Sequence, residues 1–239
     1  METAIKVMTL LPWTDWAALA AFVGGWAGYA LFAKRRSSAR PSVLASTNRI
    51  RRQWMLQATH REVRVFDGVV IQNLSTSPSF FASTTILIIG GLLAVLGTSE
   101  KATELVLEIP FAARTSVLVF DLKIVLMLMI FVYAFFRFTW SMRQYTFGAL
   151  MVAAAPEAEV LTAQGAQGEA WRQGFADRAG RVVGLAAETF NDGLRAYYFA
   201  FAAIGWFFSP LLFVFATAIV VYILYQREFH SEVLEVLNA

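Results

Sequence analysis

Few side chains in this sequence could carry out acid–base, nucleophilic or metal chemistry. There is no cysteine, which excludes disulfides, thiolate metal ligands and thiol nucleophiles. The two histidines, His60 and His230, are predicted to lie on opposite sides of a membrane, so one subunit cannot pair them around a metal ion. Glu157 and Glu159 could act as acids or bases, but we expect them to be solvated in a loop. The sequence contains no nucleotide-binding loop and no nucleophile elbow, so we expect no enzyme activity, no catalytic residue, no metal and no cofactor.

A run of hydroxyl and amide side chains leads into the second of four apolar segments. Such groups would be costly if they faced lipid, so we expect them to face protein, backbone or water. In one interpretation they line a polar path through a channel or transporter. In the other they bond to neighbouring helices or to their own preceding carbonyls. The candidate path comprises Gln72, Asn73, Ser79, Ser83, Thr84 and Thr85.

Two charged residues, Asp121 and Lys123, lie inside the third apolar segment. A charge at membrane depth is costly to bury, so each is a candidate functional residue. The alternative is an interfacial position, in which Lys123 snorkels and Asp121 pairs with a neighbour such as Arg114. Residues two apart point to different sides of a helix, so we expect no ion pair between them. Asp15, near the start of the first segment, has the same interfacial interpretation.

The composition indicates the class of protein that must position these residues. With 58% hydrophobic and 15% charged residues, the chain is too apolar for an ordinary water-soluble domain. A helix needs about 20 apolar residues to cross a bilayer. We therefore predict an all-α, polytopic helical membrane protein that forms a single domain over 1–239. Its four transmembrane helices are predicted at about 11–33, 80–96, 116–138 and 198–225, with Pro210 kinking the last one.

The loops predict the orientation of these helices. The loop 34–79 contains nine Lys or Arg residues and two acidic residues, which favours the cytoplasm by the positive-inside rule. The segment after the second helix contains Glu100, Glu104 and Glu108 against Lys101 and Arg114. The C-terminal tail is also acidic. We therefore predict both termini on the outer side of a bacterial inner membrane, with 34–79 and 139–197 in the cytoplasm.

The cytoplasmic segments are predicted to contain helices of their own. One continues from the third span over 141–155 and ends before Pro156, and Gly165 and Gly168 mark a turn. From Glu169, apolar residues recur every three to four positions, which indicates an amphipathic helix leading into the fourth span. A second such helix lies among the arginines of the loop 34–79. These helices either pack on one another, lie beside anionic lipid, or form a docking surface.

Four strings of residues resemble an uncharacterised membrane family, catalogued as domain of unknown function 599, found in bacteria and plants. The strings are SVLASTNRIRRQWM at 42–55, SFFASTTILIIGGL at 79–92, LKIVLMLMIFVYAFFRFTWSMRQY at 122–145 and NDGLRAYYFAFAA at 191–203. The resemblance implies a multi-pass membrane protein and supplies no activity. On the predicted topology, the polar members of these strings lie at the cytoplasmic face and form a candidate interaction face of Asn48, Arg51, Arg52, Trp54, Arg143, Asn191 and Arg195.

Three functional hypotheses follow from the sequence. The first is a non-enzymatic interaction or assembly component whose basic cytoplasmic face binds a membrane-protein partner or anionic lipid. The second is a channel or transporter that self-associates and is lined by the polar start of the second span. The third, a membrane enzyme that acts on lipid, has little support because no catalytic constellation is present. A net charge of +3 gives no reason to expect a nucleic-acid partner.

Overall fold

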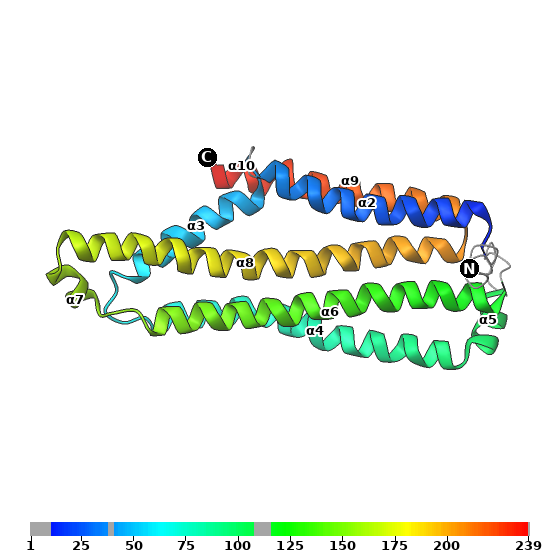
Figure 1. Ribbon diagram of the computed structural model, residues 1–239, viewed down its shortest axis with the longest axis horizontal. Coiled ribbons are helices and arrows are strands. Elements are labelled where there is room, and N and C mark those ends of the chain that lie inside the picture. Colours follow the sequence, from blue (N-terminus) through cyan, green and yellow to red (C-terminus); the bar gives the residue numbers. More distant parts are fainter. Residues whose placement is uncertain (1–10, 38–40, 108–115, 239) are drawn as a thin grey trace, which may run out of the picture. The chain divides into compact units, whose positions relative to one another are not determined.

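A computed structural model describes residues 11–37, 41–107 and 116–238, and these residues form helices and no strand (Figure 1). This confirms the predicted all-α class. Four helical stretches are long and apolar enough to cross a membrane, namely Trp13–Arg36, Val65–Gly97, Val117–Ala153 and Pro210–Asn238. The elements are α2 (Trp13–Ser37), α3 (Val43–Ala58), α4 (Val65–Gly97), α5 (Ser99–Leu107), α6 (Val117–Ala153), α7 (Ala158–Ala163), α8 (Ala166–Ile204), the 3-10 turn η1 (Gly205–Phe207), α9 (Pro210–Phe229) and α10 (Glu232–Asn238).

The chain separates into two compact units. Unit 1 comprises 1–36, 85–134 and 194–227, and unit 2 comprises 37–84, 135–193 and 228–239. Helices α4, α6 and α8 each contribute residues to both units. Two residues named above, Glu108 and Arg114, lie outside the described residues, as does Arg40 of the basic loop 34–79.

Unit 1 is built on a parallel pair of helices, α2 and α9. The Phe22 ring lies 4.8 Å from the Phe213 ring, and the Phe32 ring lies 6.2 Å from the Tyr225 ring, so both helices advance in the same direction (Figure 1). Aromatic side chains of α8 and η1 complete the core. Trp26 stacks on Phe199, and Trp206 stacks on Phe213.

The prediction that 198–225 forms a single kinked helix is wrong. Its first residues are the end of α8, which also belongs to unit 1, and the chain then turns at η1 before α9 begins. Ser209 caps α9, because its Oγ accepts a hydrogen bond from the backbone N–H of Leu212 at 3.0 Å. Pro210 is the first residue of α9, where its missing N–H costs nothing. Pro210 therefore starts a helix rather than bending one.

The C-terminal tail contacts the start of α3 within unit 2. The backbone N–H of Leu44 donates to Glu228 at 3.1 Å, and the hydroxyl of Ser46 donates to Asn238 Oδ1 at 3.1 Å. A bilayer cannot separate segments that bond to each other. These contacts therefore argue against the predicted arrangement, in which the loop is cytoplasmic and the tail lies on the outer side.

Unit 2 contains a core formed mainly by α3, α6 and α8. Its buried residues are Met55, Ile71, Tyr145, Val152, Phe175, Ala176, Ala179, Val183 and Ala186. Phe175, Ala179, Val183 and Ala186 recur along α8 every three to four residues, as expected for an amphipathic helix. The last three have short side chains, which lets neighbouring helices approach.

Some of the other helix boundaries agree with the sequence prediction, and others differ from it. Helix α6 continues without interruption to Ala153, as predicted for 141–155, and Gly165 has a positive φ of 58° in the turn before α8. Gly168, predicted to share that turn, instead lies in α8. Helix α4 starts 15 residues before the predicted span at 80–96, since it already begins at Val65 and continues through Pro78.

Candidate functional site

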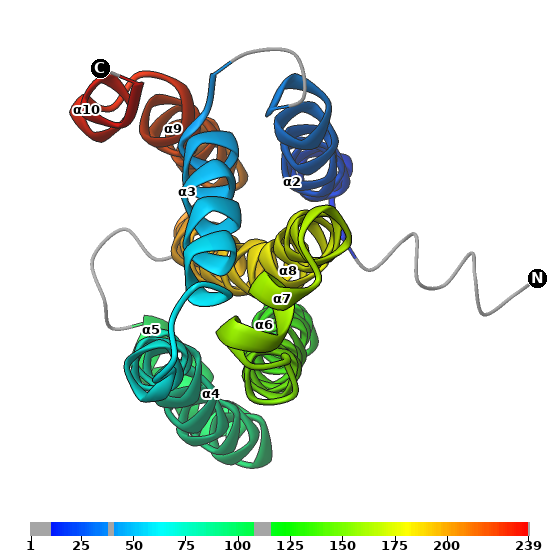
Figure 2. The ribbon, with the colours of Figure 1, turned by 90° about the vertical axis from the view of Figure 1, so that its left-hand side faces the viewer.

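Helix α3 packs against α8 in unit 2 because two glycines of α8 leave room for it. A Cβ at Gly180 would lie 2.9 Å from Arg52 Cα, and a Cβ at Gly184 would lie 2.8 Å from Asn48 Oδ1. The side-chain amide of Asn48 donates to Glu188 at 3.1 Å across this contact. On its other side α3 meets α10 (Figure 2). Two glycines about one turn apart therefore set the position of the basic helix.

Arg51 and Arg52, two members of the candidate interaction face, make their polar contacts inside unit 2. Arg51 donates to Asn48 Oδ1 at 2.8 Å and to Thr47 Oγ1 at 3.0 Å. Burial lowers the pKa of the Arg51 guanidinium, while nearby Tyr145 and Glu188 act in the opposite direction. Arg52 forms an ion pair with Asp177 of α8. Arg52 therefore joins α3 to α8, whereas the hydrogen bonds of Arg51 remain within α3.

The other members of that face are dispersed. The indole N–H of Trp54 donates to Asp67 at 2.7 Å, which ties α3 to the start of α4. Arg143 is exposed on α6, and Asn191 is half-buried on α8. Arg195 belongs to unit 1, where its guanidinium lies 5.6 Å from the centre of the Tyr29 ring. Six of the seven residues thus belong to unit 2 and one, Arg195, belongs to unit 1.

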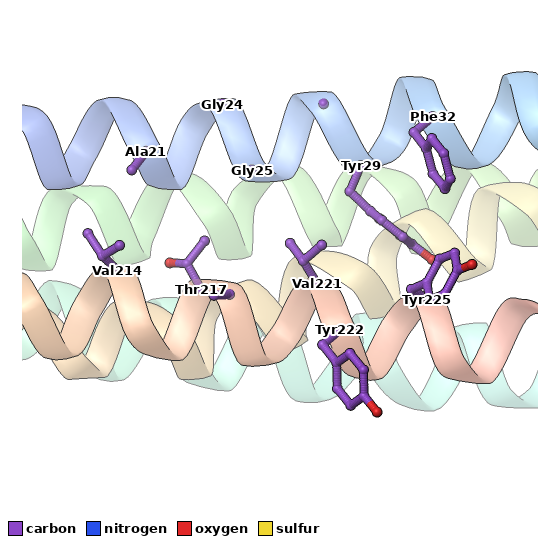
Figure 3. Close-up of a pocket in the computed structure, with 12 residues that line it drawn as sticks. Ala21, Gly24, Gly25, Tyr29, Phe32, Val214, Thr217, Val221, Tyr222 and Tyr225 are labelled. Atoms are coloured by element: carbon purple, nitrogen blue, oxygen red, sulfur yellow. The ribbon is translucent and has the colours of Figure 1, made fainter. Parts of the chain in front are cut away.

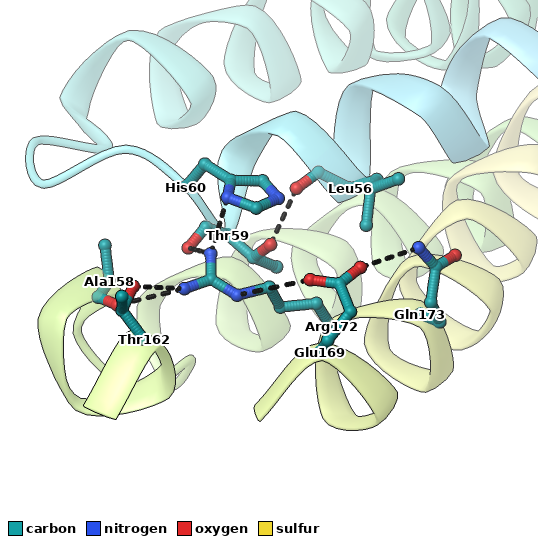
Figure 4. A network of polar contacts seen from close by, with 8 residues as sticks. All are labelled: Leu56, Thr59, His60, Ala158, Thr162, Glu169, Arg172 and Gln173. Atoms are coloured by element: carbon teal, nitrogen blue, oxygen red, sulfur yellow. Dashed lines mark hydrogen bonds and ion pairs between the residues drawn. The ribbon is translucent and has the colours of Figure 1, made fainter. Parts of the chain in front are cut away.

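A buried arginine that the sequence analysis missed joins three segments of unit 2 (Figure 4). Arg172 of α8 is only 3% exposed. Its Nη1 donates to the Thr59 carbonyl at 2.9 Å and lies 2.8 Å from His60 Nδ1. Its Nη2 donates to the Ala158 carbonyl at 3.0 Å and to Thr162 Oγ1 at 2.9 Å. The guanidinium therefore fixes the turn after α3 against α7.

A second arginine fixes the other end of the same turn. Arg64 donates through Nε to the Ala58 carbonyl at 3.0 Å and through Nη1 to the Ala155 carbonyl, just after α6, at 2.6 Å. Arg61 pairs with the buried carboxylate of Asp67. The connection between α3 and α4 is therefore held by charged hydrogen bonds at several points, which rank among the stronger ones in proteins.

The helix that follows this fixed turn exposes apolar side chains in unit 2. Val65 is 72% exposed, Phe66 68% and Val69 49%. Gln72 and Asn73 are also exposed, and the spacing of the five residues puts them on one side of α4. We call Val65, Phe66, Val69, Gln72 and Asn73 the α4 surface. Exposed apolar side chains that gather in this way suit contact with lipid or with another protein.

The remaining residues of the predicted polar path point in different directions. Ser79 is half-buried and Ser83 is exposed. Thr84 donates to the Phe80 carbonyl at 2.9 Å. The hydroxyl of Thr85 is buried and lies 2.7 Å from that of Tyr197 in unit 1, on the side of α4 opposite to Ser83. Thr84 and Thr85 therefore bond to backbone and to a neighbouring helix.

Two of the charged residues in the predicted spans, Lys123 and Asp15, are buried in unit 1 next to η1. Lys123 is 2% exposed, with its ammonium 5.6 Å from the centre of the Trp206 ring. Asp15 is 7% exposed, accepts a hydrogen bond from the Trp206 indole at 2.7 Å and interacts electrostatically with Lys123. The aromatic residues of η1 cover Lys123, so its ammonium does not extend into solvent, as the alternative of a snorkelling side chain requires. Asp121 is half-buried.

No group of three or more metal-binding side chains occurs within 11–37, 41–107 and 116–238. Residues 17–233 match a family described as "Protein of unknown function, DUF599". The chain belongs to this family. The match runs from α2 into α10, so the DUF599 region includes the fixed turn, the α4 surface and the buried Lys123 of unit 1. No curated protein matches the chain, and neither does any solved structure.

Proposed function

We propose that this DUF599 protein is a non-enzymatic interaction or assembly component that binds another membrane protein through the α4 surface. The observation that carries the proposal is the exposure of Val65, Phe66 and Val69 directly after a turn that arginines hold in place. A surface that is already fixed loses little conformational entropy on binding, so more of the contact energy becomes affinity.

The composition of the α4 surface favours a protein partner. Three apolar side chains would suit lipid or protein, but the amides of Gln72 and Asn73 continue the same side of the helix. Amide groups need hydrogen-bonding partners that lipid tails do not supply. A helix of another membrane protein offers both apolar side chains and polar groups, and helices commonly bind through residues at this spacing.

We also propose the orientation of the chain in a bacterial inner membrane. The basic loop 34–79 supports a cytoplasmic position for the C-terminal end of α2. Because α9 is parallel to α2, its C-terminal end and the tail are cytoplasmic as well, and the start of α2 is on the outer side. On this orientation α8 returns the chain to the outer side before α9 begins, which makes five crossings, although α8 is not one of the four stretches that are long and apolar enough to span a membrane.

Site-specific photo-crosslinking in cells tests the docking proposal. A photoreactive phenylalanine analogue at Phe66 should yield one discrete protein adduct, whose mass identifies either another protein or a second copy of this chain. The double variant Val65→Ser and Val69→Ser should reduce that adduct at least about ten-fold, since each exposed apolar side chain that becomes buried contributes on the order of 1 kcal/mol.

The control position is Ile50 of α3, which is also apolar and exposed in unit 2 but lies outside the α4 surface. The analogue at Ile50 should give no adduct of the same mass. Only lipid adducts at Phe66, or the same protein adducts from both positions, would contradict the proposed function.

A further inference from the structure

A groove runs along unit 1 between the parallel helices α2 and α9 (Figure 3). It has a volume of about 740 Å³ and is lined almost wholly by carbon, from Ala21 to Phe32 on α2 and from Val214 to Tyr225 on α9. The hydroxyl of Thr217 does not alter this character, because it donates to the Phe213 carbonyl of its own helix at 2.7 Å. The groove is thus apolar and runs parallel to two helices that can cross a membrane.

Glycines of α2 create this space. A Cβ at Gly24 or Gly28 would meet no atom within 4 Å, whereas a Cβ at Gly25 would lie 3.1 Å from Thr217 Cγ2. Gly25 therefore serves the contact between the two helices. Gly24 and Gly28 serve no contact of this kind and leave the groove open.

One end of the groove is charged. An adjoining pocket of about 480 Å³ shares Gly28 and Phe32 with the groove and continues to Arg35 and Arg36. Three tyrosines, Tyr29, Tyr222 and Tyr225, line the groove toward the same end. Tyrosine and arginine at the end of an apolar span are typical of the level of lipid headgroups.

We propose that this groove binds an anionic phospholipid, with an acyl chain between α2 and α9 and the phosphate at Arg35 and Arg36. The apolar length matches a hydrocarbon chain, and two guanidinium groups at its end match a phosphodiester in charge and hydrogen-bonding geometry. Basic pockets between transmembrane helices on the cytoplasmic side bind lipids of this charge. The inference goes beyond the proposed function, since it concerns unit 1 and requires no protein partner.

Native mass spectrometry of the full chain tests the groove. The protein is delipidated in mild detergent and titrated with phosphatidylglycerol or phosphatidylcholine. The wild type should retain one phosphatidylglycerol in preference to phosphatidylcholine. The double variant Gly24→Leu and Gly28→Leu fills the groove without displacing any neighbour of a Cβ and should lose that lipid. The matched variant Gly90→Leu and Gly91→Leu adds the same bulk to α4, also in open space, and should retain it.

Charge variants test the headgroup end of the groove separately. Arg35→Gln and Arg36→Gln should each weaken phosphatidylglycerol binding about five-fold and leave phosphatidylcholine binding unchanged. Lys34→Gln removes a charge from the same basic run, but Lys34 does not line either pocket, so binding should stay near the wild-type value. Equal retention of both lipids by the wild type, or unchanged phosphatidylglycerol retention in the Gly24→Leu and Gly28→Leu variant, would overturn the proposal.

Discussion

At the scale of single residues, arginines rather than carboxylates organise unit 2. A guanidinium has five N–H donors in a rigid plane, so one side chain can bond to carbonyls of different segments. Arg172 does this for the residues around Thr59 and Ala158, and Arg64 does it for the ends of α3 and α6. Lysine could supply the charge but not this geometry.

Replacing Arg172 should therefore destabilise the protein strongly. Arg172→Ala leaves the buried carbonyls of Thr59 and Ala158 without their donor, at a cost of about 2–4 kcal/mol. Arg172→Lys should recover only a small part of this loss. The measurement is the thermal midpoint of the purified protein, which should fall by roughly 5–10 °C.

Arg178→Ala is the matched control, because Arg178 is exposed on the same helix. Its midpoint should remain within a few degrees of the wild type. Equal midpoints for the Arg172 and Arg178 alanine variants would show that the buried guanidinium does not stabilise the turn.

Sequence alone identifies charges in apolar segments but not their surroundings. The sequence leaves two interpretations of Lys123 because hydropathy describes only its own helix, whereas the residues that bury it, Trp206 and Phe207, come from a turn more than 80 positions later in the chain. Arg172 lies between Trp171 and Phe175 on an amphipathic helix, and nothing in that pattern indicates that carbonyls from two other segments meet there.

At the scale of elements, the position of α3 depends on where α8 lacks side chains. The Arg52 backbone passes so close to Gly180 that any side chain there would displace α3 as a whole. Near Gly174, by contrast, the closest atom to a Cβ is the end of the flexible Arg178 side chain, at 3.2 Å. Equivalent substitutions on one helix should therefore have different effects.

Gly180→Ala should destabilise unit 2 by about 1–3 kcal/mol through overpacking. Gly174→Ala should be neutral or slightly stabilising, because alanine favours helix by up to about 1 kcal/mol. Hydrogen–deuterium exchange localises the effect. Amides of Val43–Ala58 should exchange faster in Gly180→Ala and at the wild-type rate in Gly174→Ala. Unchanged exchange in both variants would contradict the role of Gly180.

Most helices were predictable from sequence, and the main failure has a physical cause. Residues 198–225 are apolar throughout, and hydropathy does not distinguish one helix from two. The signal for the break was local: Ser209 followed by Pro210 is a typical helix start, which should have outweighed the expectation of a kink.

At the scale of the whole molecule, the direction of α9 determines which segments the C-terminal tail lies beside. A helix parallel to α2 returns the tail to the side of the basic loop, where α10 meets α3. The odd number of crossings proposed above follows from this contact and does not depend on loop charges.

The absence of cysteine makes this topology directly measurable. Single cysteines replacing Gln53, Glu235 and Lys101 introduce thiols at exposed positions of α3, α10 and α5. A membrane-impermeant maleimide added to intact cells should label Lys101→Cys. Gln53→Cys and Glu235→Cys should react only after the cells are permeabilised. Labelling of Glu235→Cys together with Lys101→Cys in intact cells would reverse the assignment of the tail.

The placement of α3 also has a consequence for how the protein is made. Its partners are distant in the chain: Asn48 bonds to a residue 140 positions later, and Leu44 to one 184 positions later. During synthesis α3 therefore leaves the ribosome well before α8 and α10 exist. For that interval a basic amphipathic helix is available to the translocation machinery or to acidic membrane lipids. A chain that terminates before α8 would leave the side of α3 that faces Gly180 and Gly184 uncovered permanently.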